Sequence, residues 1–260
     1  MGSLGFAMSF LWWLHLLVHC AALDGRSFVA EGPGVMASLH AVHDELLSTA
    51  KEVLLDVVFD DETLSYHLVA QPPPFGADAR VTVVRDEKST LLTTPKRPIF
   101  RSKDDSVVLS FLGDGFTALV KHQGRFYDIA TLTSGRQLKF ENKSAVRGLA
   151  FSEDLERWSN CYDQDEKTRA LAIGVAIGSK LLGNFADETE ALEWVQAIFV
   201  KTNLVYSPQL NFVLQIQSVY MQATPSGAPS WDQGNSCSMN ASTQLTAFRE
   251  WDAPEEMGLW

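Results

Sequence analysis

The chain has 260 residues, of which 46% are hydrophobic, and a formal net charge of -11 at pH 7. This apolar content is sufficient for a buried core in one large domain or two modest ones. The acidic balance and the absence of a Lys/Arg-rich block argue against nucleic acid as a partner, because a polyanion is bound through clustered cations.

The first segment has the pattern of a secretory leader. Residues 6–18 are apolar and rich in Leu and Trp, and Cys20, Ala21 and Ala22 provide the small residues that a signal peptidase accepts. We therefore expect residues 1–22 to be a signal peptide that is cleaved after Ala22, and the mature protein to be secreted. The alternative is an uncleaved signal anchor, which would be the chain's contact with a membrane, although its apolar segment is short for a bilayer span.

Cleavage of the leader would leave two cysteines, Cys161 and Cys237. In an oxidising compartment these two are expected to form a disulfide bond. The alternative is a free Cys161 thiolate that binds a metal, as the propeptides of some zymogens do. Two N-glycosylation acceptors, Asn142 in Asn-Lys-Ser and Asn240 in Asn-Ala-Ser, are consistent with a secreted glycoprotein.

Residues 35–58 carry apolar side chains between charged ones, which predicts a helix that gives way to a strand near Glu52. His40 and His43 lie three residues apart in this helix, a spacing that can hold a metal. Since no third ligand of matching geometry accompanies them, we interpret them as solvated side chains.

The next part of the chain is predicted to be rich in short strands. Residues 71–76, Gln-Pro-Pro-Pro-Phe-Gly, form a stiff break. Gly113-Asp114-Gly115 and Gln123-Gly124 are hairpin signals between apolar runs, so we predict a small antiparallel β domain. The Lys96-Arg97 pair precedes Pro98, which hinders proteolytic processing, so we interpret both residues as exposed cations. The predicted strands are residues 81–84, 106–111, 116–120 and 125–129.

Residues 170–222 have the pattern of a β-α-β unit. Residues 170–177 form an apolar run that is typical of a strand covered on both faces. Asp187 and Glu190 form a capping pair that starts a helix, and Pro208 predicts that the helix ends at Ser207. One buried helix face is predicted from apolar residues three and four positions apart, namely Ala191, Trp194, Val195, Ile198, Phe199 and Val205.

Residues 211–222 alternate between apolar and polar side chains, as a half-buried strand does. Two strands joined by a helix of this length predict a right-handed crossover between parallel strands. After a loop, residues 242–251 predict one more short helix, with Leu245 and Phe248 directed inward.

Several of these segments resemble the start of a reprolysin/adamalysin-type (ADAM-like) zinc metallopeptidase domain. They are Cys161-Tyr162, the strand 170–177, the helix end Lys-Thr-Asn-Leu-Val-Tyr at residues 201–206, and Gln-Leu-Asn-Phe-Val-Leu at residues 209–214 followed by Val-Tyr-Met at 219–221. The resemblance covers about the last third of the chain. The hairpins between residues 106 and 132 are similar to the prodomain that covers the cleft of such enzymes.

The resemblance implies an α/β fold, α+β for the whole chain, in which a β-rich prodomain-like region precedes a partial peptidase domain with parallel strands and a crossover helix. The predicted regions are a signal peptide at 1–22, the β-rich region at 23–133, a polar linker at 134–164 and the N-terminal half of the peptidase domain at 165–260. The resemblance also implies a secreted metalloendopeptidase that acts on protein or peptide substrates.

This family binds zinc through a His-Glu-x-x-His helix and a third histidine. The sequence has no histidine after His122, so we assign no catalytic residue and no metal ligand, and expect no cofactor in this chain. Gly178 stands where the family usually has an Asp, so no calcium ligand is assigned either. We expect a chain that ends before the zinc motif, either as a truncated gene model or as a natural short form, and that is inactive alone. Two alternatives stay open: a secreted non-catalytic binding or inhibitory module that uses the prodomain-like face, and an unrelated α/β domain that shares only the crossover.

Overall fold

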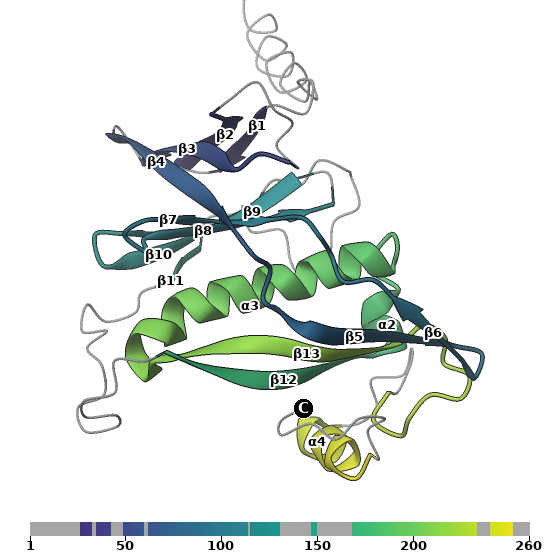
Figure 1. Ribbon diagram of the computed structural model, residues 1–260. Helices are drawn as coiled ribbons and strands as arrows, with labels where there is room; N and C mark the ends of the chain where they lie inside the picture. Colours follow the sequence, from purple (N-terminus) through teal and green to yellow (C-terminus); the bar gives the residue numbers. More distant parts are fainter. Residues whose placement is uncertain are drawn as a thin grey trace, which may run out of the picture.

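The computed structural model describes residues 27–32, 35–42, 49–59, 62–113, 115–130, 147–149, 168–232 and 240–251, and every structural statement below concerns these residues. They form two sheets with a long helix between them (Figure 1). Strand dominates and helices are few, so the predicted mixture of strand and helix is confirmed only in this coarse form.

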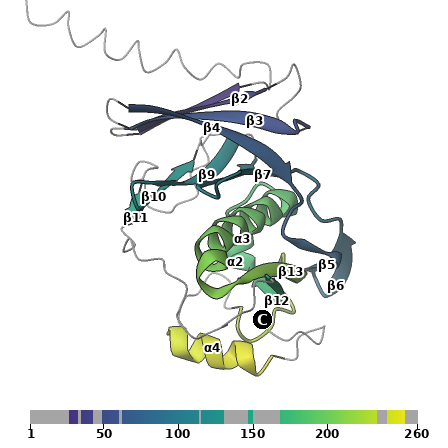
Figure 2. The same ribbon diagram turned by 60° about the vertical axis from the view of Figure 1, so that its left-hand side comes forward.

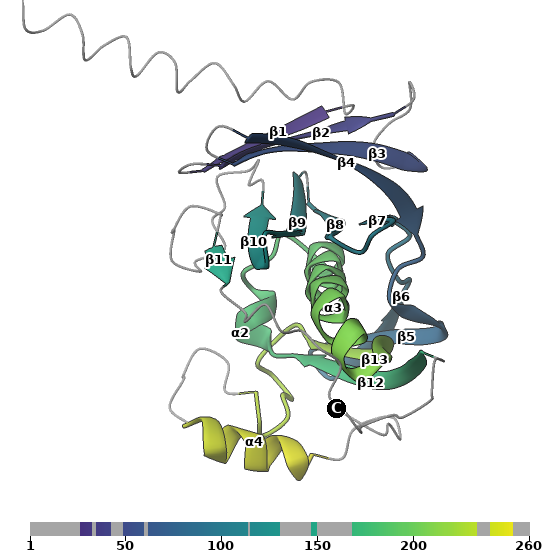
Figure 3. The same ribbon diagram turned by 90° about the vertical axis from the view of Figure 1, so that its left-hand side faces the viewer.

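The first sheet has nine strands in the order β1-β2-β3-β4-β7-β8-β9-β10-β11. Every pairing in it is antiparallel. The sheet curls, so that β1 to β4 form one layer and β7 to β11 a second layer beneath it (Figures 2 and 3). Its strands are β1 Ser27–Gly32, β2 Val35–Ala41, β3 Glu52–Phe59, β4 Glu62–Gln71, β7 Ile99–Ser102, β8 Val107–Leu112, β9 Gly115–His122, β10 Arg125–Ala130 and β11 Arg147–Leu149.

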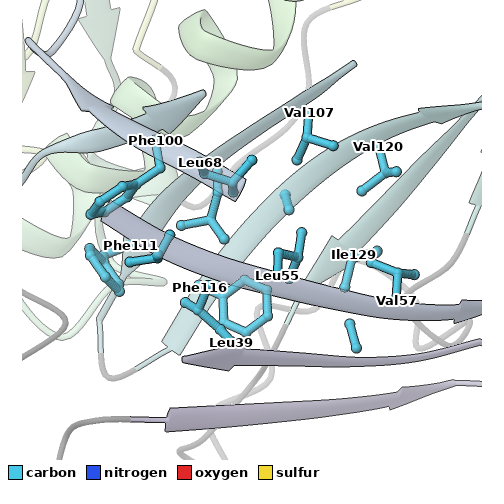
Figure 4. Close-up of a cluster of buried hydrophobic side chains, with 14 of the residues drawn as sticks. Leu39, Leu55, Val57, Leu68, Phe100, Val107, Phe111, Phe116, Val120 and Ile129 are labelled. Atoms are coloured by element: carbon cyan, nitrogen blue, oxygen red, sulfur yellow. The ribbon is translucent and has the colours of Figure 1, made fainter. Parts of the chain in front are cut away.

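A hydrophobic core fills the space between these two layers. On β3, every second side chain is buried, which is the period of a strand with one covered face. Figure 4 shows Leu55 and Val57 of this strand facing side chains from the opposite layer. The fully buried large side chains of this core are Leu39, Leu55, Leu68, Phe100, Leu109, Phe116 and Ile129.

The predicted hairpins are confirmed, and their turns use the residues that the sequence indicated. Gly113, between β8 and β9, has φ +54°. Gln123 and Gly124, between β9 and β10, have φ +48° and +73°. Two successive left-handed residues match the right-handed twist of the flanking strands, which explains the tight two-residue loop.

The predicted helix at residues 35–51 is wrong at its start, because Val35–Ala41 is strand β2. It pairs with β1 on one side and β3 on the other. Ala37 and Leu39 are buried while His40 is exposed, so the side chains follow a period of two. The strand at Glu52 is confirmed. His40 therefore lies on a strand, and His43 lies outside the described residues.

The second sheet has four strands in the order β12-β13-β5-β6. Its strands are β12 Arg169–Ile177, β13 Phe212–Gln222, β5 Phe75–Arg85 and β6 Lys88–Leu92. β13 lies between β12 and β5 and runs parallel to both, whereas β6 is antiparallel to β5. Residues 75–92 belong to the β-rich region of the sequence, yet they share this sheet with residues 169–222. The sheet thus crosses the domain boundaries predicted from the sequence.

β12 was expected to be covered on both faces, and this is wrong for its first half. The strand lies at the edge of the sheet, and Arg169 to Ala172 are exposed. Its second half is covered, because Ile177 faces one hydrophobic cluster and Ala176 the other. An apolar run does not distinguish an edge strand from a central one, which is why the pattern misled.

Three helices accompany the second sheet: α2 Ser179–Leu182, α3 Glu188–Leu210 and α4 Ala241–Arg249. α3 covers the face that looks toward the nine-stranded sheet, and α4 lies on the opposite face (Figures 1 and 3). α4 was expected to direct Leu245 and Phe248 inward. Phe248 packs with Trp231 and Tyr220, but Leu245 is 68% exposed.

The predicted start of α3 is confirmed and its predicted end is wrong. The Asp187 carboxylate accepts a hydrogen bond from the Glu190 amide at 2.8 Å, and the Glu190 carboxylate accepts one from the Ala186 amide. Pro208 lies inside the helix, which continues to Leu210 and ends at Asn211 in the left-handed conformation, with φ +56°. So close to the end of a helix, a proline removes only one hydrogen bond of the last turn, so the helix tolerates it.

Candidate functional site

α3 is buried on two opposite faces, because it lies between the two sheets. One face packs on the four-stranded sheet, where Ala191 and Val195 meet Ile216 and Val219. Toward the other end of the helix, Val200 and Leu204 pack on Val108, Leu119 and Phe126 of the nine-stranded sheet. The predicted single face included Ala191 and Val195, which are buried, but also Ile198, which is 39% exposed. Both sheets therefore depend on the same helix for their cover.

The contact of α3 with the nine-stranded sheet contains a buried carboxylate, Glu193, which is 5% exposed. Its Oε2 accepts a hydrogen bond from the Gly113 amide at 2.9 Å, and its Oε1 lies 3.1 Å from Nη1 of Arg97. Arg97 Nη1 also donates to the Gly113 carbonyl at 2.7 Å. The Gly113 amide is thus bound directly by α3, and the Gly113 carbonyl is linked to α3 through Arg97.

Burial raises the pKa of the Glu193 carboxyl above its ordinary value, because the charged form loses hydration. Arg97 and the Gly113 amide act in the opposite direction and lower this pKa, and the net direction is upward. The charge of Glu193 therefore depends on Arg97, whose side chain is 40% exposed.

Two further polar side chains of α3 bind the same sheet. Gln196 is completely buried, and its Nε2 donates to Ser110 Oγ at 3.2 Å and to the Arg97 carbonyl at 3.4 Å. Lys201 Nζ donates to Thr117 Oγ1 and to Asp128 Oδ1, each at 2.5 Å. We call Arg97, Gly113, Glu193, Gln196 and Lys201, with these partners, the α3 junction.

The four-stranded sheet is joined to the β-rich region mainly through backbone hydrogen bonds. Besides the ladder between β5 and β13, the Ala223 amide donates to the Val84 carbonyl at 2.7 Å, and the Ile216 amide to the Pro74 carbonyl at 2.7 Å. Arg85 and Glu188 form an exposed ion pair at 2.5 Å. Exposed pairs of this kind contribute little, so the ladder and the apolar contacts carry this association.

A cleft of about 250 Å³ opens beside the α3 junction, where the three prolines at 72–74 pass the starts of β12 and β13. Its walls also include Ile99, Val108 and Val200, and its polar lining residues are Gln71, Arg101, Asn203 and Gln215. The Asn203 side chain already has two backbone partners: its Nδ2 donates to the Leu214 carbonyl, and its Oδ1 accepts from the Leu214 amide. Among the described residues, no carboxylate, histidine or cysteine lines this cleft, so this lining offers no group for acid-base or nucleophilic chemistry.

The residues singled out in the sequence are only partly placed. Ala22, Asn142, Cys161 and Cys237 lie outside the described residues, and Asn240 lies at the start of α4. Within the described ranges, no group of three or more His, Cys, Asp or Glu side chains is arranged to hold a metal. In the same ranges, no helix has the length and hydrophobicity of a membrane span.

The α3 junction was missed in the sequence. Lys96 and Arg97 were interpreted as exposed cations, which fits Lys96, but Arg97 is only partly exposed and pairs with Glu193. Glu193 and Gln196 look like solvated helix positions. Residues 193, 196, 200 and 204 do recur at steps of three and four, but two of these four side chains are polar, so the stripe does not by itself predict a second buried face.

Gly113 offers a test of the turn between β8 and β9 that the α3 junction holds. The Gly113→Ala variant should be less stable by about 1–2 kcal/mol, because an L-residue is strained at positive φ. Its Cβ would also lie 3.1 Å from Glu190 Oε1. Gly183→Ala is the matched control, since Gly183 has φ -64° and room for a Cβ, and should be neutral or slightly stabilising. Urea unfolding monitored by tryptophan fluorescence measures both, and equal stability of the two variants would contradict the role of Gly113.

No known protein family matches this sequence, and no curated protein is significantly similar to it.

Proposed function

We propose that this chain comprises the β-rich prodomain and the first β-α-β unit of a secreted zinc metalloendopeptidase of the reprolysin type. In this proposal the nine-stranded sheet is the prodomain, and β12, α3 and β13 form the right-handed crossover that begins the peptidase domain. The prodomain holds the peptidase part in a latent state and supplies part of its sheet.

The observation that carries the proposal is the direct contact between the nine-stranded sheet and α3. β12 and β13 are parallel neighbours, and the connection between them in the sequence contains the short helix α2 and the long helix α3. The face of α3 turned away from its own sheet is occupied by β8 and β9 through Glu193, Gln196 and Lys201. An inhibitory prodomain must bind its peptidase domain directly, and this contact supports the proposal because it joins the two proposed parts.

Among the residues that the structure describes, none are arranged as a zinc site. The sequence contains no His-Glu-x-x-His, and in the described ranges the contact of His67 with Glu52, at 3.0 Å, is not joined by a third His, Cys, Asp or Glu that could complete a metal site. No hydrolytic step is therefore assigned to any residue of this chain. Under the proposal, zinc ligands and general base come from residues other than these 260, and the substrates are proteins or peptides.

Sequencing of the transcript beyond the Trp260 codon tests this proposal. We expect an in-frame His-Glu-x-x-His followed by a third histidine. The longer product should bind zinc and cleave casein in a chelator-sensitive manner, whereas the 260-residue chain should do neither. A longer reading frame without this motif would contradict the proposal, and so would stoichiometric zinc with turnover in the 260-residue chain.

The alternative, a non-catalytic binding or inhibitory module, would use the prodomain-like face to contact another protein. In the structure, the β8 and β9 side of that face is already covered by α3 of the same chain. A partner in trans would have to displace the helix together with its buried Glu193 and Gln196. This occupation favours the latent-peptidase proposal over the binding module.

A further inference from the structure

Asn240 is the residue that begins α4. Its backbone is extended, with φ -72° and ψ 159°, and its side chain caps the helix. Oδ1 accepts hydrogen bonds from the Thr243 amide at 2.9 Å and from Thr243 Oγ1 at 3.0 Å. Both bonds use the carbonyl oxygen, and the amide nitrogen Nδ2 takes part in neither. Asn240 itself is exposed.

The same residue is the acceptor of an Asn-Ala-Ser glycosylation tripeptide. In N-glycosylation, Nδ2 loses a proton and forms a bond to C1 of a sugar, while the bond from C1 to the pyrophosphate of a lipid-linked oligosaccharide donor breaks. The product is still an amide, and its carbonyl oxygen still accepts hydrogen bonds. Capping and glycosylation therefore require different atoms of one side chain, and they are compatible.

α4 depends on a good cap. It has nine residues, and isolated helices of that length are marginal in water. Its inner side joins an aromatic cluster in which Trp251 lies 4.9 Å from Tyr220 and 5.3 Å from Trp231, measured between ring centroids. Gln244 Nε2 also donates to the Trp231 carbonyl at 3.3 Å. Loss of the cap would weaken the helix that covers this face of the sheet.

We infer that Asn240 carries an N-linked oligosaccharide in the folded protein, attached through Nδ2, while Oδ1 continues to cap α4. The oligosaccharide then stands at the exposed start of α4, on a helix whose Leu245 is 68% exposed. The inference requires entry into the secretory pathway, and it does not depend on the peptidase proposal.

The test uses the full chain, secreted from eukaryotic cells, with Asn142→Gln as the background so that one acceptor remains. We expect one glycosidase-sensitive shift in mobility and a glycopeptide that contains Asn240. Ser242→Ala and Asn240→Asp should both abolish the shift and keep the cap, because each retains the capping oxygen. Asn240→Ala should abolish the shift and also lower the folding equilibrium constant about fivefold relative to Ser242→Ala.

N-terminal sequencing separates the ways in which this inference can fail. A chain that is cleaved after Ala22 but carries no sugar at Asn240 overturns the inference and leaves the secretory leader intact. A chain recovered with its leader and without sugar overturns both. Equal stability of the Asn240→Ala and Ser242→Ala proteins overturns the capping half, because these two unglycosylated variants differ in the cap oxygen.

Discussion

Residues 168–251, produced without residues 27–149, should not fold into a stable domain. The isolated segment would retain β12 and β13 but lose β5, which is the second neighbour of β13. β13 would then have an unpaired edge in the middle of its hydrophobic cluster, and the Val200 and Leu204 face of α3 would be exposed. Circular dichroism and urea unfolding should show no cooperative transition.

Co-expression with residues 27–149 as a separate chain is the complementary experiment. The two pieces should form a soluble complex with a cooperative transition, because the β5 ladder, the apolar contacts and the α3 junction do not require a continuous chain. Val81→Asp, in a completely buried position of β5, should abolish this rescue. Leu91→Asp on the exposed strand β6 should not. An isolated 168–251 segment with cooperative unfolding would contradict the dependence on β5.

Local features of the fold were predictable because they arise from a few adjacent residues. The Gln123-Gly124 hairpin follows from turn chemistry, and the Asp187 and Glu190 pair follows from the needs of a helix start. Strand β2 was mistaken for a helix because Leu39, Val42 and Leu46 recur at steps of three and four, which is a helical spacing that continues past the end of the strand.

Long-range features were not predictable, because they leave little trace in a local pattern. β5 looks like the hairpin strands that follow it, yet it pairs with β13, whose residues lie more than a hundred positions later in the sequence. Glu193 and Gln196 look solvated because they are polar and lie outside the one apolar face that the sequence predicts for this helix. Their burial depends on β8 and β9 covering a second face of α3, which the helix sequence alone does not specify.

Removal of Arg97 should destabilise the protein strongly for a side chain that is partly exposed. Arg97→Ala leaves the Glu193 carboxylate buried with only the Gly113 amide as a donor, and it frees the Gly113 carbonyl. We expect a loss of about 2–3 kcal/mol in the free energy of unfolding at pH 7. This lies below the loss for a fully buried pair, because the Arg97 side chain is 40% exposed and water can partly replace it.

The pH dependence of this variant identifies Glu193 as the cause. Since burial raises the pKa of Glu193 in the folded protein, protonation favours folding, so its contribution to stability is fully present below the ordinary pKa of 4.5. The contribution is lost as the pH rises through the raised folded value. Arg97 lowers the pKa of Glu193, so its removal raises that pKa further and enlarges the loss. The deficit of Arg97→Ala relative to the parent should therefore grow from about pH 4 to pH 7.

The control is the double variant Arg97→Ala/Glu193→Gln. The introduced glutamine amide is neutral and its oxygen can still accept from the Gly113 amide, so the double variant should be more stable at pH 7 than Arg97→Ala alone. Its deficit should also be nearly independent of pH, because no buried carboxyl remains to titrate at this position. A deficit that follows the same pH course with and without Glu193 would assign the effect to other carboxylates and would contradict the role of the α3 junction.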